Sequence, residues 1–211
     1  KAIAFDGFVI FDPKPVFALA EDSFPGKGAT LSELWRTRQF EYCWLRTLTG
    51  RHADFWQVTE DSLVFAAAAL KLDLTAEKRD RLMQAYLSLK AYPDVIAGLR
   101  SLRDAGIRLA FLSNLTERML ESAVASAGLD GQFAALLSTD RVRAYKPDPR
   151  AYQMGIDGLG LRREEIVFAA FGGWDAAGAK NFGYRTFWAN RRALPVEALG
   201  ARPDAIGETV T

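Results

Sequence analysis

Four parts of the chain carry polar side chains where an apolar run ends or a turn begins. They are Asp6 near the start, Ser113 with Asn114 in the middle, Lys146 in a proline-rich turn, and Asp175 after a later apolar run. The carboxyl ends of parallel strands meet at one edge of a sheet, where such sheets hold their ligands. A carboxylate there can act as a covalent nucleophile, a second one as a general base, and a lysine can keep a carboxylate ionised. The order predicts one catalytic site.

Each of these residues also has a purely structural explanation. Asp6 fits an N-cap or a turn residue, Ser113 and Asn114 fit caps of the helix that follows, and Asp175 precedes a helix expected over 176–182. Lys146 fits a solvated turn. If these residues were unrelated helix caps, however, nothing would explain why a lysine precedes the Pro-x-Pro turn. The joint pattern therefore favours a shared site.

The composition is that of an ordinary globular chain. Its 211 residues, 49% hydrophobic and 25% charged, can bury one core, or one core with a small accessory domain. The 27 basic and 26 acidic residues leave a net charge of +1, so a nucleic-acid partner has no support.

No apolar run approaches the ~20 residues that span a bilayer. Because Cys43 is the single cysteine and no signal peptide precedes the first strand, we expect a cytoplasmic protein.

The elements that must position these residues alternate along most of the chain. Strands are expected over 3–5, 107–112, 133–137, 166–171 and 184–188, and helices over 94–105, 116–127, 149–159 and 176–182. This alternation implies a Rossmann-like α/β core, a parallel sheet with right-handed crossovers and helices on both faces. Between its first strand and the rest, helices are expected over 32–48, capped by Ser32, over 61–70 and over 75–89.

This helical stretch interrupts the alternation of strands and helices, as an inserted domain would. We expect residues 1–15 and 91–211 to form the catalytic core and residues 16–90 an all-helical cap domain over the carboxyl edge of its sheet. The apolar helices of that cap also allow a homodimer. A last helix is expected after 203–206, and we therefore expect a trimmed or disordered terminus at Thr211.

Longer segments carry a resemblance to a known family. The same order of residue types resembles the haloacid dehalogenase superfamily, and within it the L-2-haloacid dehalogenase branch, over nearly the whole chain. The segments concerned are Leu34 to Arg46, Gly50 to Trp56, Leu112-Ser113-Asn114, Tyr145-Lys146-Pro147 and Trp174 to Gly183. Phosphatases of the superfamily carry a second Asp where this chain has Phe8, and clustered oxygen ligands for Mg²⁺ are absent. The resemblance implies an enzyme without metal or cofactor that acts on a small 2-haloacid.

The resemblance also implies a role for each residue. Asp6 attacks the carbon that bears the halogen, displaces halide with inversion and forms an aspartyl ester, which water cleaves to give a 2-hydroxy acid. Lys146 keeps Asp6 ionised, and Asp175 positions or deprotonates the water. The residues implied for binding are Arg36 and Asn114 for halide, Ser113 for the substrate carboxylate, the active-site tyrosine Tyr152, and Phe40, Phe55 and Trp174 for the alkyl group. Core packing explains the last three almost equally well.

Two departures from the family pattern stand out. The family segment Asp-Ala-Tyr-Gly-Thr-Leu-Phe-Asp is one residue longer than Asp6 to Asp12, and neither Val9 nor Ile10 can replace its threonine hydroxyl. The family Ser-Ser-Asn-Gly is replaced by Ala170-Phe171-Gly172-Gly173, and losing the asparagine threatens ester hydrolysis more than the initial attack.

These departures leave three hypotheses open. The first is a working or weakened dehalogenase, the second a non-catalytic protein that binds a small carboxylate, and the third a Mg²⁺-dependent phosphatase, which the missing second Asp disfavours. A serine or cysteine hydrolase has little support, because His52, the only histidine, lies in the cap and Cys43 has no evident base.

Overall fold

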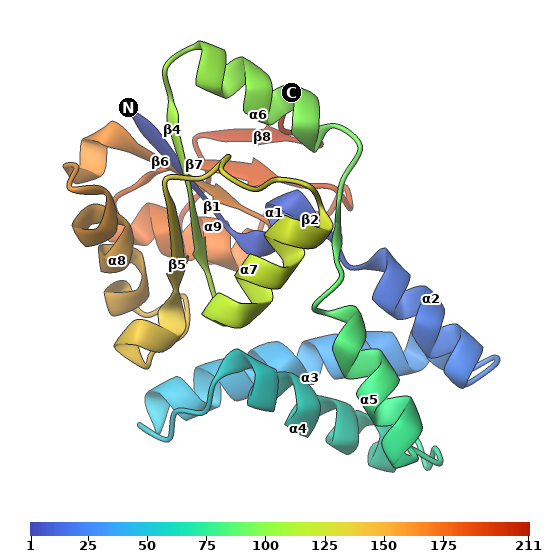
Figure 1. The fold of residues 1–211 in the computed structure, drawn as a ribbon. Helices are drawn as coiled ribbons and strands as arrows, with labels where there is room; N and C mark the ends of the chain where they lie inside the picture. Colours follow the sequence, from blue (N-terminus) through green and yellow to red (C-terminus); the bar gives the residue numbers. More distant parts are fainter.

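The computed structural model describes all 211 residues, and its centre is a six-stranded sheet (Figure 1). The strands lie in the order β5-β4-β1-β6-β7-β8, and every neighbouring pair is parallel. They are β1 (Ala2–Phe5), β4 (Arg108–Ser113), β5 (Ala135–Ser138), β6 (Ile166–Ala170), β7 (Arg185–Ala189) and β8 (Ala205–Gly207). β1 lies between β4 and β6, with Phe5 opposite Phe111 and Ala169. The carboxyl ends of these three strands therefore meet.

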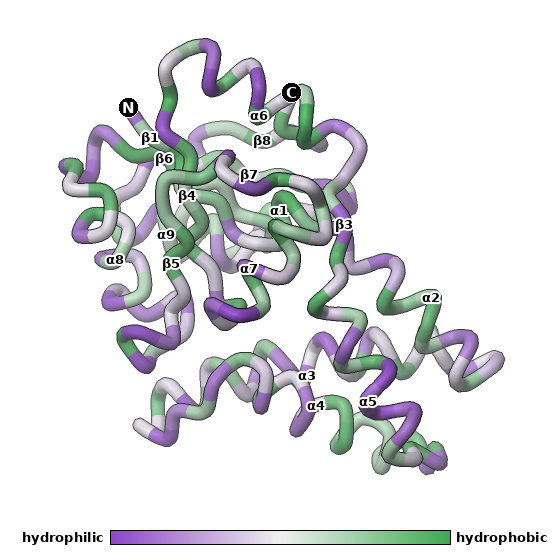
Figure 2. The backbone as a smooth tube through the Cα atoms, in the orientation of Figure 1, coloured by the Kyte–Doolittle hydropathy of each residue, from purple (hydrophilic) through white to green (hydrophobic).

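Helices cover both faces of the sheet because its strands are apolar on both sides. Along β1, Phe5 belongs to one buried cluster and Ala4 to the other, and Phe111 and Leu112 of β4 divide in the same way. The first cluster includes residues of α6 (Val95–Asp104) and α7 (Glu117–Ser126), and the second includes residues of α8 (Pro149–Leu159) and α9 (Gly173–Phe182). Figure 2 shows the hydrophobic residues concentrated along the sheet. Burial on both faces is typical of parallel sheets, and the expected α/β fold is confirmed.

Four longer helices stand between the first strand and the rest of the sheet. They are α2 (Lys14–Ser23), α3 (Gly28–Leu48), α4 (Phe55–Ala69) and α5 (Ala76–Ala85), and they follow the single turn α1 (Gly7–Ile10). Figure 1 shows them beyond the carboxyl edge of the sheet. A short antiparallel pair, β2 (Phe11–Asp12) with β3 (Lys90–Ala91), joins the chain where it enters and leaves this region. The arrangement suits a cap, and the division into residues 16–90 and the remainder stays a prediction.

Two helices of this region begin at other positions than expected. α3 starts at Gly28, and Ser32 lies buried inside it. At Gly28 the helix passes so close to α2 that an added Cβ would lie 2.2 Å from the Cα of Glu21. α4 starts at Phe55 because Asp54 caps it by accepting the Gln57 N–H at 2.8 Å. Capping and close packing, which apolar periodicity does not record, set both starts.

The remaining differences lie at the ends of elements. α5 ends at Ala85, four residues early, because the chain then turns towards β3, with the Tyr86 N–H bonded to the Met83 carbonyl at 3.0 Å. Residues 205–207 form β8 along the free edge of β7, and no helix follows residue 206 before Thr211. The Asn190 N–H donates to the Gly207 carbonyl there at 2.7 Å. The chain thus adds a strand to the sheet near its end.

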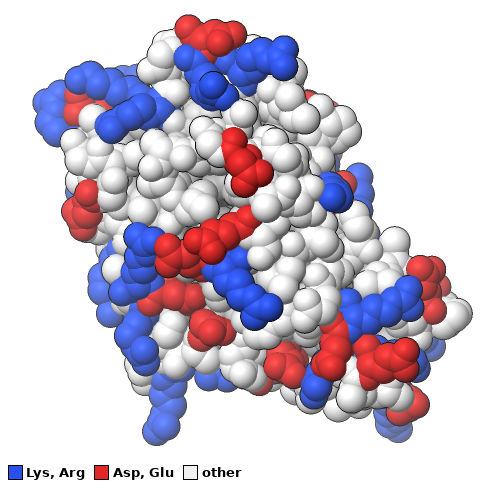
Figure 3. Space-filling view, viewed as in Figure 1, with Lys and Arg blue, Asp and Glu red and all other residues white.

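Charged side chains of both signs are interspersed on the face shown in Figure 3. No basic stripe runs across that face, in keeping with the net charge of +1. None of the helices combines the length and the hydrophobicity that crossing a membrane requires.

A mostly buried ion pair joins the segment between β7 and β8 to the start of α6. Arg191 Nη1 lies 2.8 Å from Asp94 Oδ1, with side chains only 9% and 15% exposed, and the Val210 N–H donates to Asp94 Oδ2 at 2.9 Å. The variant Asp94→Ala leaves this guanidinium without its carboxylate. We expect the free energy of unfolding, measured by urea denaturation, to fall by about 3 kcal/mol.

The exposed pair of Arg141 and Glu117 provides the control. Its atoms lie 2.6 Å apart, but the side chains are 48% and 52% exposed, so Arg141→Ala should cost less than ~1 kcal/mol. An Asp94→Ala variant as stable as this control would show that the buried pair is unimportant.

Candidate active site

The candidate nucleophile occupies the junction of the central strand and α1. Asp6 follows β1 and caps α1, accepting the Phe8 N–H at Oδ1 over 2.9 Å. Its own N–H donates to the Ala169 carbonyl of β6 at 2.9 Å. The backbone thus fixes the carboxylate at the carboxyl edge of the sheet, and its side chain is 11% exposed. The N-cap explanation and the catalytic explanation of Asp6 both fit.

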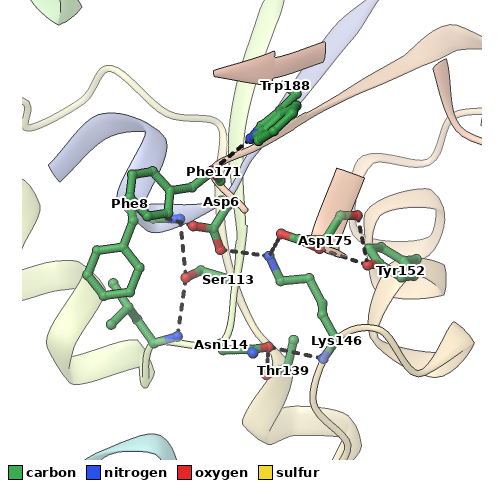
Figure 4. A network of polar contacts seen from close by, with 12 residues as sticks. Asp6, Phe8, Ser113, Asn114, Thr139, Lys146, Tyr152, Phe171, Asp175 and Trp188 are labelled. Atoms are coloured by element: carbon green, nitrogen blue, oxygen red, sulfur yellow. Dashed lines mark hydrogen bonds and ion pairs between the residues drawn. The ribbon is translucent and has the colours of Figure 1, made fainter. Parts of the chain in front are cut away.

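A buried lysine joins the two acids (Figure 4). Lys146 Nζ lies 2.7 Å from Asp6 Oδ2 and 2.8 Å from Asp175 Oδ2, and its side chain is fully buried. Burial alone lowers the pKa of Lys146, but the charges of Asp175 and Asp6 outweigh it, so the pKa lies above its usual value. The ammonium therefore stays charged. The solvated-turn explanation of Lys146 is wrong.

The second acid is held on both oxygens. Asp175 lies in the first turn of α9, which starts at Gly173 and not after Asp175, so its side chain is free of the capping role. Its Oδ1 accepts the Tyr152 hydroxyl at 2.7 Å, opposite Lys146. Burial raises the pKa of Asp175 to about 6, although the Lys146 ammonium opposes this. Burial, and then the charge of Asp175, raise the pKa of Tyr152 well above its usual value, so the phenol remains a donor.

Glycines make room for this arrangement at two points. A Cβ at Gly178 would lie 2.6 Å from the Tyr152 hydroxyl oxygen, and a Cβ at Gly7 would lie 2.9 Å from Ser113 Oγ. The first contact lets α9 approach α8, and the second lets the turn after Asp6 approach the end of β4.

The side-chain oxygens of Ser113 and Asn114 accept hydrogen bonds from backbone N–H groups, and each side chain keeps a donor group that has no partner in the protein. Ser113 Oγ accepts from Gly7 N at 3.3 Å and Leu115 N at 3.2 Å, which leaves the hydroxyl proton free to donate. Asn114 Oδ1 accepts the Lys146 N–H at 3.1 Å and the Thr139 hydroxyl at 3.2 Å. The side-chain NH₂ of Asn114 is then the free donor. Ser113 thereby supports the turn after Asp6, from which the family threonine is missing.

A small cavity opens beside these groups. Its remaining space is about 10 Å³, close to the minimum that holds one water molecule. The residues that line it are Asp6, Phe8, Phe40, Phe55, Ser113, Asn114, Phe171, Gly172, Trp174 and Asp175. Seven of the ten site residues expected from the sequence are among them. Lys146 and Tyr152 lie behind the wall and act on it through Asp6 and Asp175.

Arg36, the tenth expected residue, lies among aromatic rings. Its Cζ is 4.8 Å from the ring centroid of Phe171, 5.5 Å from that of Phe40 and 5.9 Å from that of Phe8. Burial lowers the pKa of Arg36, although the guanidinium remains charged. No carboxylate pairs with it. A desolvated cation at the side of a cavity can bind an anion.

Sequence reasoning missed part of the cavity wall. Phe8 and Phe171 were seen only as replacements for an acid and a serine, yet their rings pack 5.9 Å apart and line the cavity. The available signal was that Phe171 directly follows β6 and that Phe8 lies three residues beyond the end of β1. At Gly172 an added Cβ would lie 2.8 Å from Trp174 Nε1, so the indole occupies the space that an asparagine side chain would need.

The donor set does not favour a divalent metal. No group of three or more His, Cys, Asp or Glu side chains is placed to hold one. The two acids that face each other, Asp6 and Asp175, already share the Lys146 ammonium. Phe8 stands where a second acid of a phosphatase would be.

Known proteins share this fold and sequence. A family model described as haloacid dehalogenase-like hydrolase matches residues 13–183. The chain is 43% identical over 205 residues to the (S)-2-haloacid dehalogenase of Pseudomonas sp. strain YL, covering 97% of this chain and 88% of that protein. It is 42% identical over 205 residues to haloacetate dehalogenase H-2 of Moraxella sp. strain B, covering 97% and 92%.

A solved structure is also similar over the whole length of this chain. The L-2-haloacid dehalogenase of Xanthobacter autotrophicus with chloropropionic acid covalently bound gives a TM-score of 0.91 at 33% identity, covering 100% of this chain and 95% of that chain. This similarity comes with a parallel α/β core whose carboxyl edge carries an acid beside a buried lysine, and together they point to one class of hydrolase. The chain belongs to the haloacid dehalogenase-like hydrolases.

The Lys146 network makes stability depend on pH in a testable way. In Lys146→Met the two acids share a buried site without a cation, so one takes up a proton and its pKa in the folded protein rises. A carboxyl group with a raised folded pKa stabilises the fold at low pH, and this stabilisation is lost as the pH rises through that pKa. We expect the melting temperature to fall by about 8 °C at pH 8 and by less at pH 5.

Thermal unfolding at the two pH values measures this difference. Lys90→Met removes an exposed lysine whose Nζ donates to the Ser126 carbonyl at 2.7 Å, and it should change both melting temperatures little. Equal losses for Lys146→Met at pH 5 and pH 8 would contradict the coupling of the two acids.

Proposed function

We propose that the protein hydrolyses small (S)-2-haloacids to 2-hydroxy acids through an ester on Asp6. The observation that carries the proposal is the Asp6 carboxylate, exposed to the cavity on one side and paired with the buried Lys146 at 2.7 Å on the other. The names of the relatives support it, as does the covalently bound chloropropionic acid of the Xanthobacter enzyme. The enzyme class is a hydrolase acting on carbon–halide bonds.

The first step is a displacement at carbon. Asp6 forms a C–O bond to the carbon that bears the halogen while the carbon–halogen bond breaks, and the halide leaves with the electron pair. The Ser113 hydroxyl proton, which no protein acceptor takes, suits the substrate carboxylate. The Arg36 guanidinium and the Asn114 NH₂ suit the departing halide, because charge develops there in the transition state.

The second step is hydrolysis of the ester. Water adds to the ester carbonyl of Asp6, and one of its protons passes to Asp175. As the acyl–oxygen bond breaks, Asp175 returns that proton to the leaving alkoxide, which departs as the 2-hydroxy acid. Asp6 becomes a carboxylate again by losing the second water proton to solvent. Lys146 and Tyr152 orient Asp175 from both sides, so its carboxylate has little freedom to turn away. Gly172 supplies no side-chain donor at this wall, which makes hydrolysis the step most open to slowing.

Residues 16–90 would form a cap that closes this cavity. Phe40 of α3 and Phe55 of α4 line it together with core residues. The cavity as it stands is smaller than a haloacid, so the substrate enters by movement of this wall.

Location and assembly are further parts of the proposal. The buried free thiol of Cys43 supports a cytoplasmic location. The exposed Leu45 and Leu48 of α3, 53% and 83% exposed, support a homodimer through the cap.

The role of Asp6 is tested with Asp6→Asn. With L-2-chloropropionate or chloroacetate and no added metal, we expect chloride release to disappear, because the uncharged amide is a poor nucleophile. Chloride release and intact protein mass should be followed together. Asp157→Asn, at an exposed site on α8, is the matched control and should keep full activity. Undiminished release by Asp6→Asn would exclude the covalent mechanism.

The role of Asp175 is tested by the pH dependence of ester hydrolysis. Asp175 accepts a proton only when ionised, and burial raises its pKa to about 6 in the free protein. The ester removes the charge of Asp6, which contributes to this rise, so the rate should be level near neutral pH and fall only as the pH drops below about 6. Single-turnover experiments that follow the protein mass give this rate directly. The prompt release of the first equivalent of chloride, which does not use Asp175, is the internal control. A hydrolysis rate that is flat from pH 5 to pH 8 would rule out this base.

A further inference from the structure

Phe171 lines the cavity together with Asp6, and its ring contacts the Arg36 guanidinium. It follows β6 directly, lines the cavity, and its carbonyl accepts the Trp188 indole N–H at 3.0 Å. In Figure 4 Phe8 and Phe171 lie on the side of Asp6 away from Lys146. The backbone of Phe171 is therefore fixed, and its ring is held against Phe8 at 5.9 Å.

The ring of Phe171 is the closest aromatic face to Arg36. The guanidinium carbon lies 4.8 Å from its centroid, whereas the rings of Phe40 and Phe8, at 5.5 and 5.9 Å, are close to the outer limit of about 6 Å for a cation–π contact. Other partly buried arginines of the chain have carboxylate partners, such as Arg46 with Asp61 at 2.5 Å. Arg36 has aromatic faces only, so nothing but these rings restrains a long and flexible side chain.

The contact also spans the two parts of the fold. Arg36 belongs to α3, in the helical region, and Phe171 to the edge of the sheet beside Asp6. The ring of Phe171 therefore links the position of the Arg36 guanidinium to the edge of the sheet that carries Asp6. It also adds no donor of its own, so an anion there depends on Arg36 and Asn114.

We infer that Phe171 is a positioning residue for Arg36, and that its ring holds the guanidinium as a receptor for halide. The inference rests on the proposed function for the identity of the anion. Phe171 stands where the resembled family has a serine, so its contact with Arg36 arises at a position where this chain departs from the family pattern. A guanidinium that is already in place loses less freedom when the anion binds.

The test is bromide binding at constant ionic strength, followed by quenching of tryptophan fluorescence, since Trp174 lines the cavity. Phe171→Leu keeps an apolar side chain and removes the aromatic face. We expect the dissociation constant for bromide to rise about fivefold. Phe171→Tyr restores the face and should stay within about twofold of the unmodified protein. Arg36→Met should abolish the signal and so assigns it to this cation.

Phe65→Leu is the matched control. Phe65 lies under Arg38, with the guanidinium carbon 4.3 Å from its ring centroid, on the exposed side of α4. The same substitution there removes a cation–π contact and should leave bromide binding unchanged. Phe171→Met is a second apolar variant if leucine disturbs packing, and it should weaken binding as leucine does.

The outcomes separate the inference from the proposed function. If the unmodified protein releases chloride from haloacids but Phe171→Leu and Phe171→Met bind bromide as tightly as it does, the positioning role is overturned and the function stands. If no haloacid is turned over, yet bromide binding weakens in Phe171→Leu and not in Phe171→Tyr, the proposed function fails and the anion receptor stands.

Discussion

One buried ammonium determines how the rest of the site must be built. Lys146 has no access to solvent and lies within 2.8 Å of a carboxylate oxygen on each side. A lone buried cation is costly, so both acids must be held in place around it. Neighbouring parallel strands provide this, because β1 carries Asp6 and β6 leads to the helix that carries Asp175. Two carboxylates and one ammonium leave one net negative charge, and Arg36 is the nearby cation that offsets it before a substrate anion enters.

The helical region supports the same lysine from the other side. Tyr145, the residue before Lys146, donates its hydroxyl to the Ala53 carbonyl at 2.5 Å and its N–H to the Thr47 hydroxyl at 3.0 Å. Its ring packs 6.2 Å from that of Phe55, which lines the cavity. Asn114 fixes the N–H of Lys146 from the sheet. The loop that carries the lysine is therefore anchored to both parts of the fold, and one apolar cluster runs through them.

The sequence predicted what repeats locally and missed what depends on distant contacts. The parallel sheet followed from alternating apolar runs, and the grouping of Asp6, Lys146 and Asp175 followed from their order after strands. β8 was not predictable in this way, because three residues become a strand only beside the free edge of β7. Nor was the contact of Arg36 with Phe171, since it joins a helix of the inserted region to the end of β6. Such pairs are set by packing of the whole chain and leave no periodic signal.

The departures from the family pattern affect the second proposed step, ester hydrolysis, more than the first, displacement of halide. The proposed displacement needs a fixed carboxylate, which the pairing of Asp6 with Lys146 provides, and a receptor for halide, for which Arg36 is the proposed group. The hydrolysis needs a base and donors for the water and the oxyanion, and Gly172 removes one donor, a loss that commonly costs about a hundredfold. An asparagine could not simply be restored, because the Trp174 indole lies 2.8 Å from where its Cβ would be. Gly172 and the Trp174 indole therefore depend on each other for packing. Asp175, held by Lys146 and Tyr152, is the group that this packing leaves in place as the proposed base for hydrolysis.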